Sequence, residues 1–76
     1  MSDPIEAFRS KPGEFFLAAE KVAKGDRFQV RDVVYEVASD PRQWGVGWVA
    51  TVKVVQGLRP GSEFRAMLFT GRKVEG

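Results

Sequence analysis

Hydrophobic and polar residues alternate along most of the chain after residue 26, with the period of two that is typical of β-strands. Four runs follow this pattern, at residues 27–30, 33–37, 48–55 and 63–69. A tight turn at Arg31-Asp32 separates the first two runs, and the glycine-proline sequence 56–61 separates the last two. With one more strand expected near 15–19, a spacing of roughly ten residues predicts a small antiparallel barrel or sandwich of about five strands.

The N-terminal part of the chain is less regular. Asp3-Pro4-Ile5-Glu6 combines a capping residue, a proline and a glutamate in the order typical of a helix start, and SKPG at 10–13 ends the element. Residues 14–24 fit either a helical stripe or one strand face, and we favour a strand near 15–19 followed by a single turn. The sequence therefore predicts an N-terminal extension at 1–13, a short helix or a flexible segment, and a barrel at 14–76.

The outward-facing positions of these strands are less polar than a solvated surface requires. Two interpretations remain open. Either the N-terminal extension covers part of this surface through Ile5 and Phe8, or the surface contacts a protein, by self-association or by pairing with a partner's strand. The outward apolar residues are Phe16, Val34, Val49, Val55, Met67 and Phe69.

The sequence lacks two residue types on which many catalytic sites depend. The 76 residues include no cysteine and no histidine, so thiolate nucleophiles, the commonest general base and the commonest metal ligand are missing. A domain of this size has a thin core that leaves little room for a walled substrate pocket. Asp26, Asp32, Glu36 and Asp40 show no spacing that would hold a metal or flank a glycosidic bond. We therefore expect no enzyme, no cofactor, no metal and no small-molecule substrate.

The chain carries no signal for export or membrane insertion. Its start, MSDPIEAFRS, is acidic and polar where a signal peptide is basic and then apolar, and no apolar run approaches the roughly 20 residues of a membrane helix. Together with the lack of cysteine, this predicts a cytoplasmic protein without a membrane partner. Asparagine is absent, isoleucine occurs once and arginine outnumbers lysine, a bias that indicates a GC-rich bacterial genome or that of a phage.

Charge is unevenly distributed although the net charge is only +2. Residues 1–40 carry eight acidic and six basic residues, whereas residues 41–76 carry two acidic and six basic residues. A basic half attracts an anionic partner at long range, but an ordinary solvated surface has the same composition. The basic residues of this half are Arg42, Lys53, Arg59, Arg65, Arg72 and Lys73, of which the last two are expected in a solvated C-terminal tail.

The stretch PRQWGVGW at 41–48 is predicted to be a protruding loop, and its residue types suit a single-stranded nucleic acid. An indole stacks on a base and an arginine holds a phosphate, while Gly45 and Gly47 let the backbone fit a partner closely. Structural roles are the alternative, because Trp48 starts a strand in the inward register and Trp44 could close the barrel mouth as a lid. The candidate partner-binding residues are Arg42, Gln43, Trp44, Trp48, Lys53, Arg59 and Arg65.

From Val22 onward the order of features resembles the N-terminal domain of bacterial elongation factor P, which is related to initiation factor five-A of archaea and eukaryotes. The matching segments are VAKGDRFQV, VVYEV, the loop at 41–47, WVATVKV, the turn GLRPG and the ending FTGRKVEG. The resemblance implies an SH3-like barrel of the KOW group and an RNA partner. The family's loop carries a modified lysine that reaches into the ribosome, whereas Arg42 is the only basic residue of 41–47. The resemblance therefore implies the fold more than the activity.

These observations predict a small non-enzymatic binding module. We expect it to bind RNA or single-stranded DNA through the 41–48 loop and the outward basic residues. The alternative is a protein-protein interaction module, phage-encoded or regulatory, that uses Trp44 and the apolar sheet face as its contact. A further alternative is a homo-oligomeric structural protein.

Overall fold

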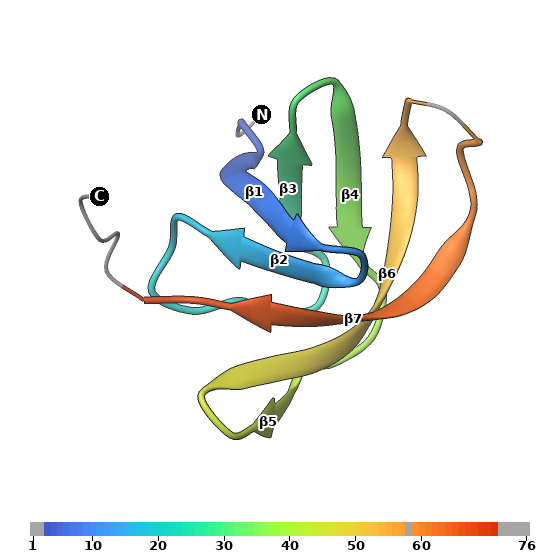
Figure 1. Ribbon diagram of the computed structural model, residues 1–76. Coiled ribbons are helices and arrows are strands. Elements are labelled where there is room, and N and C mark those ends of the chain that lie inside the picture. Colours follow the sequence, from blue (N-terminus) through green and yellow to red (C-terminus); the bar gives the residue numbers. More distant parts are fainter. Residues whose placement is uncertain (1–2, 58, 72–76) are drawn as a thin grey trace.

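The computed structural model describes residues 3–57 and 59–71, which form a small SH3-like β-barrel (Figure 1). The barrel confirms the fold class that the alternating pattern and the resemblance predicted. Nowhere in these residues does a helix occur that is long and apolar enough to cross a membrane. The strands are β1 (Ile5–Lys11), β2 (Glu14–Leu17), β3 (Arg27–Val30), β4 (Val33–Val37), β5 (Arg42–Trp44), β6 (Gly47–Gln56) and β7 (Glu63–Phe69).

Six of the strands close on themselves. The hydrogen-bonded order is β4-β3-β1-β2-β7-β6-β5, and a further pairing between β4 and β6 joins the two ends of the first six strands. The pairings β1–β3 and β2–β7 are parallel, and the others are antiparallel. Closure pairs the strand edges that would otherwise be open to other chains. β5 lies outside the closed ring and pairs with β6 (Figure 1).

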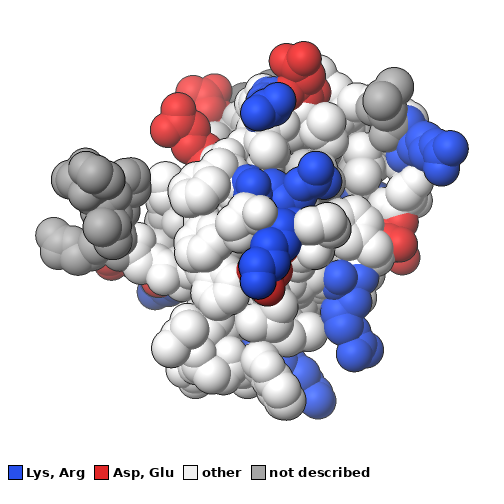
Figure 2. Space-filling model, in the orientation of Figure 1, with Lys and Arg blue, Asp and Glu red and all other residues white. Residues whose placement is uncertain are grey.

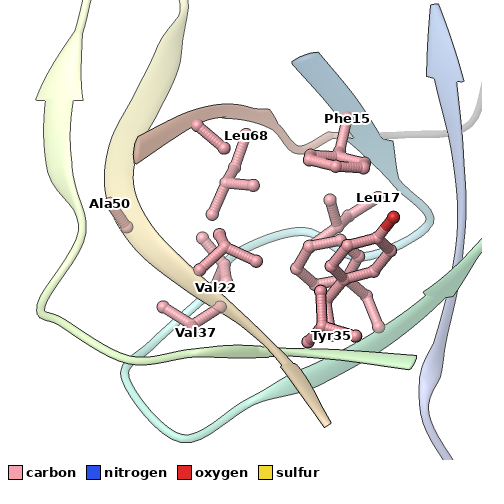
Figure 3. Close-up of a cluster of buried hydrophobic side chains, with 11 residues drawn as sticks. Phe15, Leu17, Val22, Tyr35, Val37, Ala50 and Leu68 are labelled. Atoms are coloured by element: carbon pink, nitrogen blue, oxygen red, sulfur yellow. The ribbon is translucent and has the colours of Figure 1, made fainter. Parts of the chain in front are cut away.

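The interior of the barrel is apolar and centred on aromatic rings. Phe15 and Phe28 have ring centroids 5.1 Å apart, and Tyr35 lies 4.9 Å from Phe15 and 5.1 Å from Phe28. Leucine, valine and alanine side chains from β2, β4, β6 and β7 fill the rest of the interior (Figure 3). The inward positions of the alternating pattern are therefore correctly predicted for Tyr35, Val37 and the even-numbered residues of 50–54 and 66–68.

The N-terminal segment is neither the short helix nor the flexible extension that the sequence predicted, because Ile5–Lys11 is strand β1. The local sequence Asp3-Pro4-Ile5-Glu6 favours a helix start, but β1 gains long-range pairings that outweigh this preference. It pairs with β2 through Phe8↔Phe16 and with β3 through Glu6↔Gln29. The segment expected to be an extension of the barrel is thus part of the closed ring.

Residues 14–24 follow the strand alternative. Glu14–Leu17 is strand β2, and residues 18–20 form a bend without helix. The connection to β3 runs along one end of the barrel, where Val22 is buried in the core cluster. It is fixed by backbone hydrogen bonds from Gly25 N–H to Val37 C=O and from Val37 N–H to Asp26 C=O, both 2.8 Å.

The protruding loop predicted at 41–48 is instead a β-hairpin. Arg42–Trp44 forms β5 and pairs with the start of β6 through Arg42↔Val49 and Trp44↔Gly47. Gly45 and Val46 form the turn, and Gly45 has φ +62°, a conformation that glycine adopts without steric cost. Leu58 of the predicted turn, and Arg72 and Lys73 of the predicted tail, lie outside the described residues.

Candidate functional site

β-sheet register decides which of the predicted binding residues share a surface. Directly paired residues on neighbouring strands project from the same face of a sheet. On β6 the outward positions are Gly47, Val49 and Thr51, and their partners are Trp44 and Arg42 on β5 and Arg65 on β7. Arg42, Trp44 and Arg65 therefore project from one face, although Arg65 lies more than twenty residues from the other two in the sequence.

These side chains surround an open depression of about 540 Å³ between β5, β6 and β7, which we call the hairpin depression. Trp44 is 66% exposed and Arg42 and Arg65 are exposed as well. The depression thus has an accessible indole and two accessible guanidinium groups in its wall. Its lining residues are Ser39, Asp40, Arg42, Gln43, Trp44, Val49, Ala50, Thr51 and Arg65.

The two arginines of the hairpin depression have no intramolecular ion pair within residues 3–57 and 59–71. The salt bridge in this part of the chain joins Arg27 to Glu36, at 4.0 Å. Asp40 is the acidic residue among those that line the depression. Two positive charges against one negative charge leave the depression basic, which favours an anionic ligand.

Sequence reasoning missed the residues that shape the floor and rim of the depression. The Ser39 hydroxyl accepts a hydrogen bond from the Thr51 backbone N–H, at 2.8 Å, and this bond ties the segment before β5 to the middle of β6. Ser39, Asp40 and Thr51 carry no motif. The β6–β7 register sets Thr51 opposite Arg65, and the hydrogen bond from Thr51 to Ser39 brings the segment before β5 to the same place. No local signal in the sequence could have identified them.

The other candidate residues lie elsewhere. Trp48 is partly buried against the core, and its Nε1–H donates a hydrogen bond to Thr70 Oγ1, at 3.2 Å. Lys53 is partly buried and stands in register between Glu36 on β4 and Glu63 on β7, so acidic neighbours flank its charge. Arg59 is exposed in the β6–β7 turn with φ +57°. None of these three lines the hairpin depression, whereas Gln43 does.

A second feature of the outer surface is a line of aromatic residues across three strands, which we call the phenylalanine row. It consists of Phe8 on β1, Phe16 on β2 and Phe69 on β7, and Phe8 and Phe16 are exposed. The sequence predicted Phe16 and Phe69 as outward and placed Phe8 in an N-terminal extension, and it left open whether this extension covers them or whether they contact a protein. Phe8 does stack on Phe16, yet the row remains open to solvent.

Other outward apolar residues are less exposed than the sequence predicted. Val34 is buried, at 8% exposure, although it stands outside the core cluster; Gln29 and Gln56 flank it in register. Val49, Val55 and Met67 are partly buried. Within residues 3–57 and 59–71, the open apolar surface therefore lies at the phenylalanine row, Trp44 and Val46.

Uncharged surface covers the left side of the view in Figure 2 and continues down to the β5–β6 hairpin, while Lys and Arg side chains lie in the middle of the view and on its right side. Within the described ranges, no three His, Cys, Asp or Glu side chains are grouped so that they could hold a metal ion. The surface chemistry available here is therefore aromatic, apolar and cationic.

Comparisons with protein-family models, with curated proteins and with solved structures find no match for this chain. The resemblance to the elongation factor P domain therefore stays a prediction. The function has to be argued from the site itself.

Proposed function

We propose that this chain is a small non-enzymatic module that binds single-stranded nucleic acid at the hairpin depression. The observation that supports the proposal is the meeting of Arg42 and Trp44 from β5 with Arg65 from β7 around one open depression. An accessible aromatic ring beside accessible guanidinium groups is the combination that single-strand binding surfaces use.

Each residue has a defined part in this binding. Trp44 offers an indole on which an unpaired base stacks, an interaction worth about 1–3 kcal/mol per base. Arg42 and Arg65 hold the flanking phosphates, because a guanidinium presents paired N–H donors that match two phosphate oxygens. A duplex keeps its bases stacked on each other, so the proposed ligand is RNA or DNA in single-stranded form.

The small size of the hairpin depression limits the affinity that we expect for a nucleic acid. One indole and two arginines engage few nucleotides, so binding to a short oligonucleotide is weak and depends on salt. Each phosphate contact on a single strand contributes about −0.7 to the slope of log affinity against log salt. Two arginine contacts therefore predict a slope near −1.4 from this site.

The proposal is tested by measuring that slope for the parent and for arginine variants with a fluorescently labelled mixed-sequence single strand, as RNA and as DNA. Arg42→Gln with Arg65→Gln should abolish most of the slope and weaken binding at low salt. Arg59→Asn removes one positive charge from a distant turn, at a position whose positive φ suits asparagine, and is the control for each of the two arginine changes made singly. Equal slopes in the double variant and in the control would refute the proposal.

A further inference from the structure

One side chain of the hairpin depression opposes the phosphate contacts of the two arginines. Asp40 lines the depression together with Arg42 and Arg65, and its side chain is exposed. A carboxylate repels a phosphate, so Asp40 weakens the attraction that the arginines provide. The salt bridge and the side-chain hydrogen bonds within residues 3–57 and 59–71 involve other groups, so the carboxylate oxygens are available to a ligand.

Asp40 and Trp44 lie at opposite ends of the depression. Trp44 pairs with Gly47 at the start of β6. The residue before Asp40 is held at the middle of β6, by the hydrogen bond between Ser39 and Thr51. Gly47 and Thr51 are four residues apart, roughly 13 Å at the rise of a strand. A base stacked on the Trp44 indole within the depression therefore has room to turn one edge toward Asp40.

The chemistry of a carboxylate decides which base edge suits this position. An ionised carboxylate accepts hydrogen bonds and donates none, and its two oxygens can take two parallel donors. Unpaired bases are read on their Watson–Crick edges, and guanine carries two adjacent donors there, N1–H and the N2 amino group. On the same edge of adenine, cytosine, uracil and thymine, every donor has an acceptor beside it, whose lone pair would face a carboxylate oxygen.

We propose that the hairpin depression selects guanine, which stacks on Trp44 and donates N1–H and N2–H to the Asp40 carboxylate. This inference rests on the proposed function, because it names the base that the same single-strand site prefers. Arg42 and Arg65 attract any strand, whereas Asp40 makes a strand without guanine bind less well. Specificity arises in this way when a site disfavours the wrong ligand as well as favouring the right one.

The first test compares short thymidine strands in which one central base is guanine, hypoxanthine, adenine or cytosine, by fluorescence anisotropy at low salt. The guanine strand should bind about tenfold more tightly than the adenine and cytosine strands, the discrimination of one good bidentate contact. Hypoxanthine keeps N1–H but lacks the N2 amino group, so its strand should lie between them. Equal binding of all four strands would overturn the guanine contact and leave the proposed function standing, whereas no binding of any strand would overturn both.

A charge removal separates a base contact from simple electrostatics. Asp40→Asn keeps the shape of the side chain, removes its charge and replaces one acceptor with a donor. Affinity for the guanine strand should fall, because one of the two hydrogen bonds is lost, while affinity for the adenine strand should rise, because the repulsion of phosphate is lost. Affinities that rise together would show that Asp40 acts through its charge alone and would overturn the inference.

Asp32→Asn is the matched control for this experiment. It makes the same exchange at an exposed residue between β3 and β4, outside the hairpin depression. It should leave the ratio of the two affinities as it is in the parent, and circular dichroism checks that both variants are folded. A change of this ratio in Asp32→Asn as large as in Asp40→Asn would also overturn the inference.

Discussion

Phe15 and Phe16 are neighbours in the sequence and have opposite roles. Phe15 points into the barrel, is 1% exposed and contacts Phe28 and Tyr35. Phe16 points outward, is 37% exposed and stacks between Phe8 and Phe69. One strand thus supplies aromatic rings to two clusters of similar ring spacing, in which the neighbours of Phe15 are tilted against it and those of Phe16 are stacked on it.

The difference between the clusters shows which aromatic residues the fold requires. The interior cluster closes the barrel, and a chain of this size has few other sources of stability. The phenylalanine row adds stacking contacts to a barrel that is already closed. Aromatic rings that the fold does not need, and that remain in contact with water, are available for binding a partner.

The largest expected effect comes from removing the interior ring. Phe15→Ala should lower the free energy of unfolding by about 3–5 kcal/mol, because the cavity cannot collapse inside a closed barrel. Chemical denaturation followed by circular dichroism measures this loss. A loss below about 1 kcal/mol would show that the interior cluster does not hold the barrel together.

A smaller loss of stability is expected from a change at Gly47, which lies against Phe69 of the phenylalanine row. A Cβ at this position would lie 2.8 and 2.9 Å from two ring carbons of Phe69 and 3.0 Å from the Leu68 carbonyl oxygen. Gly47→Ala should therefore cost about 1–3 kcal/mol and displace Phe69 from its stack.

The Gly47 effect has an internal control. Phe69→Ala removes the ring that the new methyl group would strike, so Gly47→Ala should cost less in that background than in the parent, as measured by denaturation of the four proteins of a double-mutant cycle. Strict additivity of the two changes would show that the ring is not the cause.

Phe8→Ala removes a ring of the phenylalanine row, as Phe15→Ala removes a ring of the interior cluster. It should lower the free energy of unfolding by only about 0.5–1.5 kcal/mol, the contribution of one aromatic pair. Chemical denaturation followed by circular dichroism measures this loss. A loss as large as that of Phe15→Ala would remove the distinction between the two clusters.

The smallest expected effect is a gain, at the turn between β3 and β4. Arg31 has φ +56°, a conformation that is costly for a long side chain and tolerated by asparagine. Arg31→Asn should stabilise the barrel by up to about 1 kcal/mol in thermal or chemical denaturation. Asp32→Asn, one residue further on and without positive φ, is the matched control and should give no gain.

The strands that alternate strictly could be predicted from the sequence, because one of their faces is buried. Tyr35, Val52 and Leu68 are inward in the pattern and buried in the structure. β1 could not be predicted, since its pairings with β2 and β3 are set by distant residues while its own first residues favour a helix. β5 could not be predicted either, because its three residues are all exposed and show no burial pattern.

The candidate site was predictable in its residue types and not in its arrangement. The exposed Trp44 and the basic residues around it were visible as an aromatic, positively charged stretch. That Arg65 joins them, while Lys53 and Arg59 do not, follows from the register of β6 with its neighbours. Phe8 lies beside Phe16 on the outer surface because Ile5–Lys11 is a strand, which the sequence did not predict.

The most direct test of nucleic-acid binding uses the two tryptophans separately. Trp48→Phe leaves Trp44 as the reporter in the hairpin depression, and Trp44→Phe leaves Trp48, which packs against the core. On titration with single-stranded RNA or DNA at low and moderate salt, the account predicts quenching of Trp44 that fades as salt is added, and an unchanged Trp48. Unchanged fluorescence of Trp44 at every salt concentration, or equal changes in both variants, would contradict it.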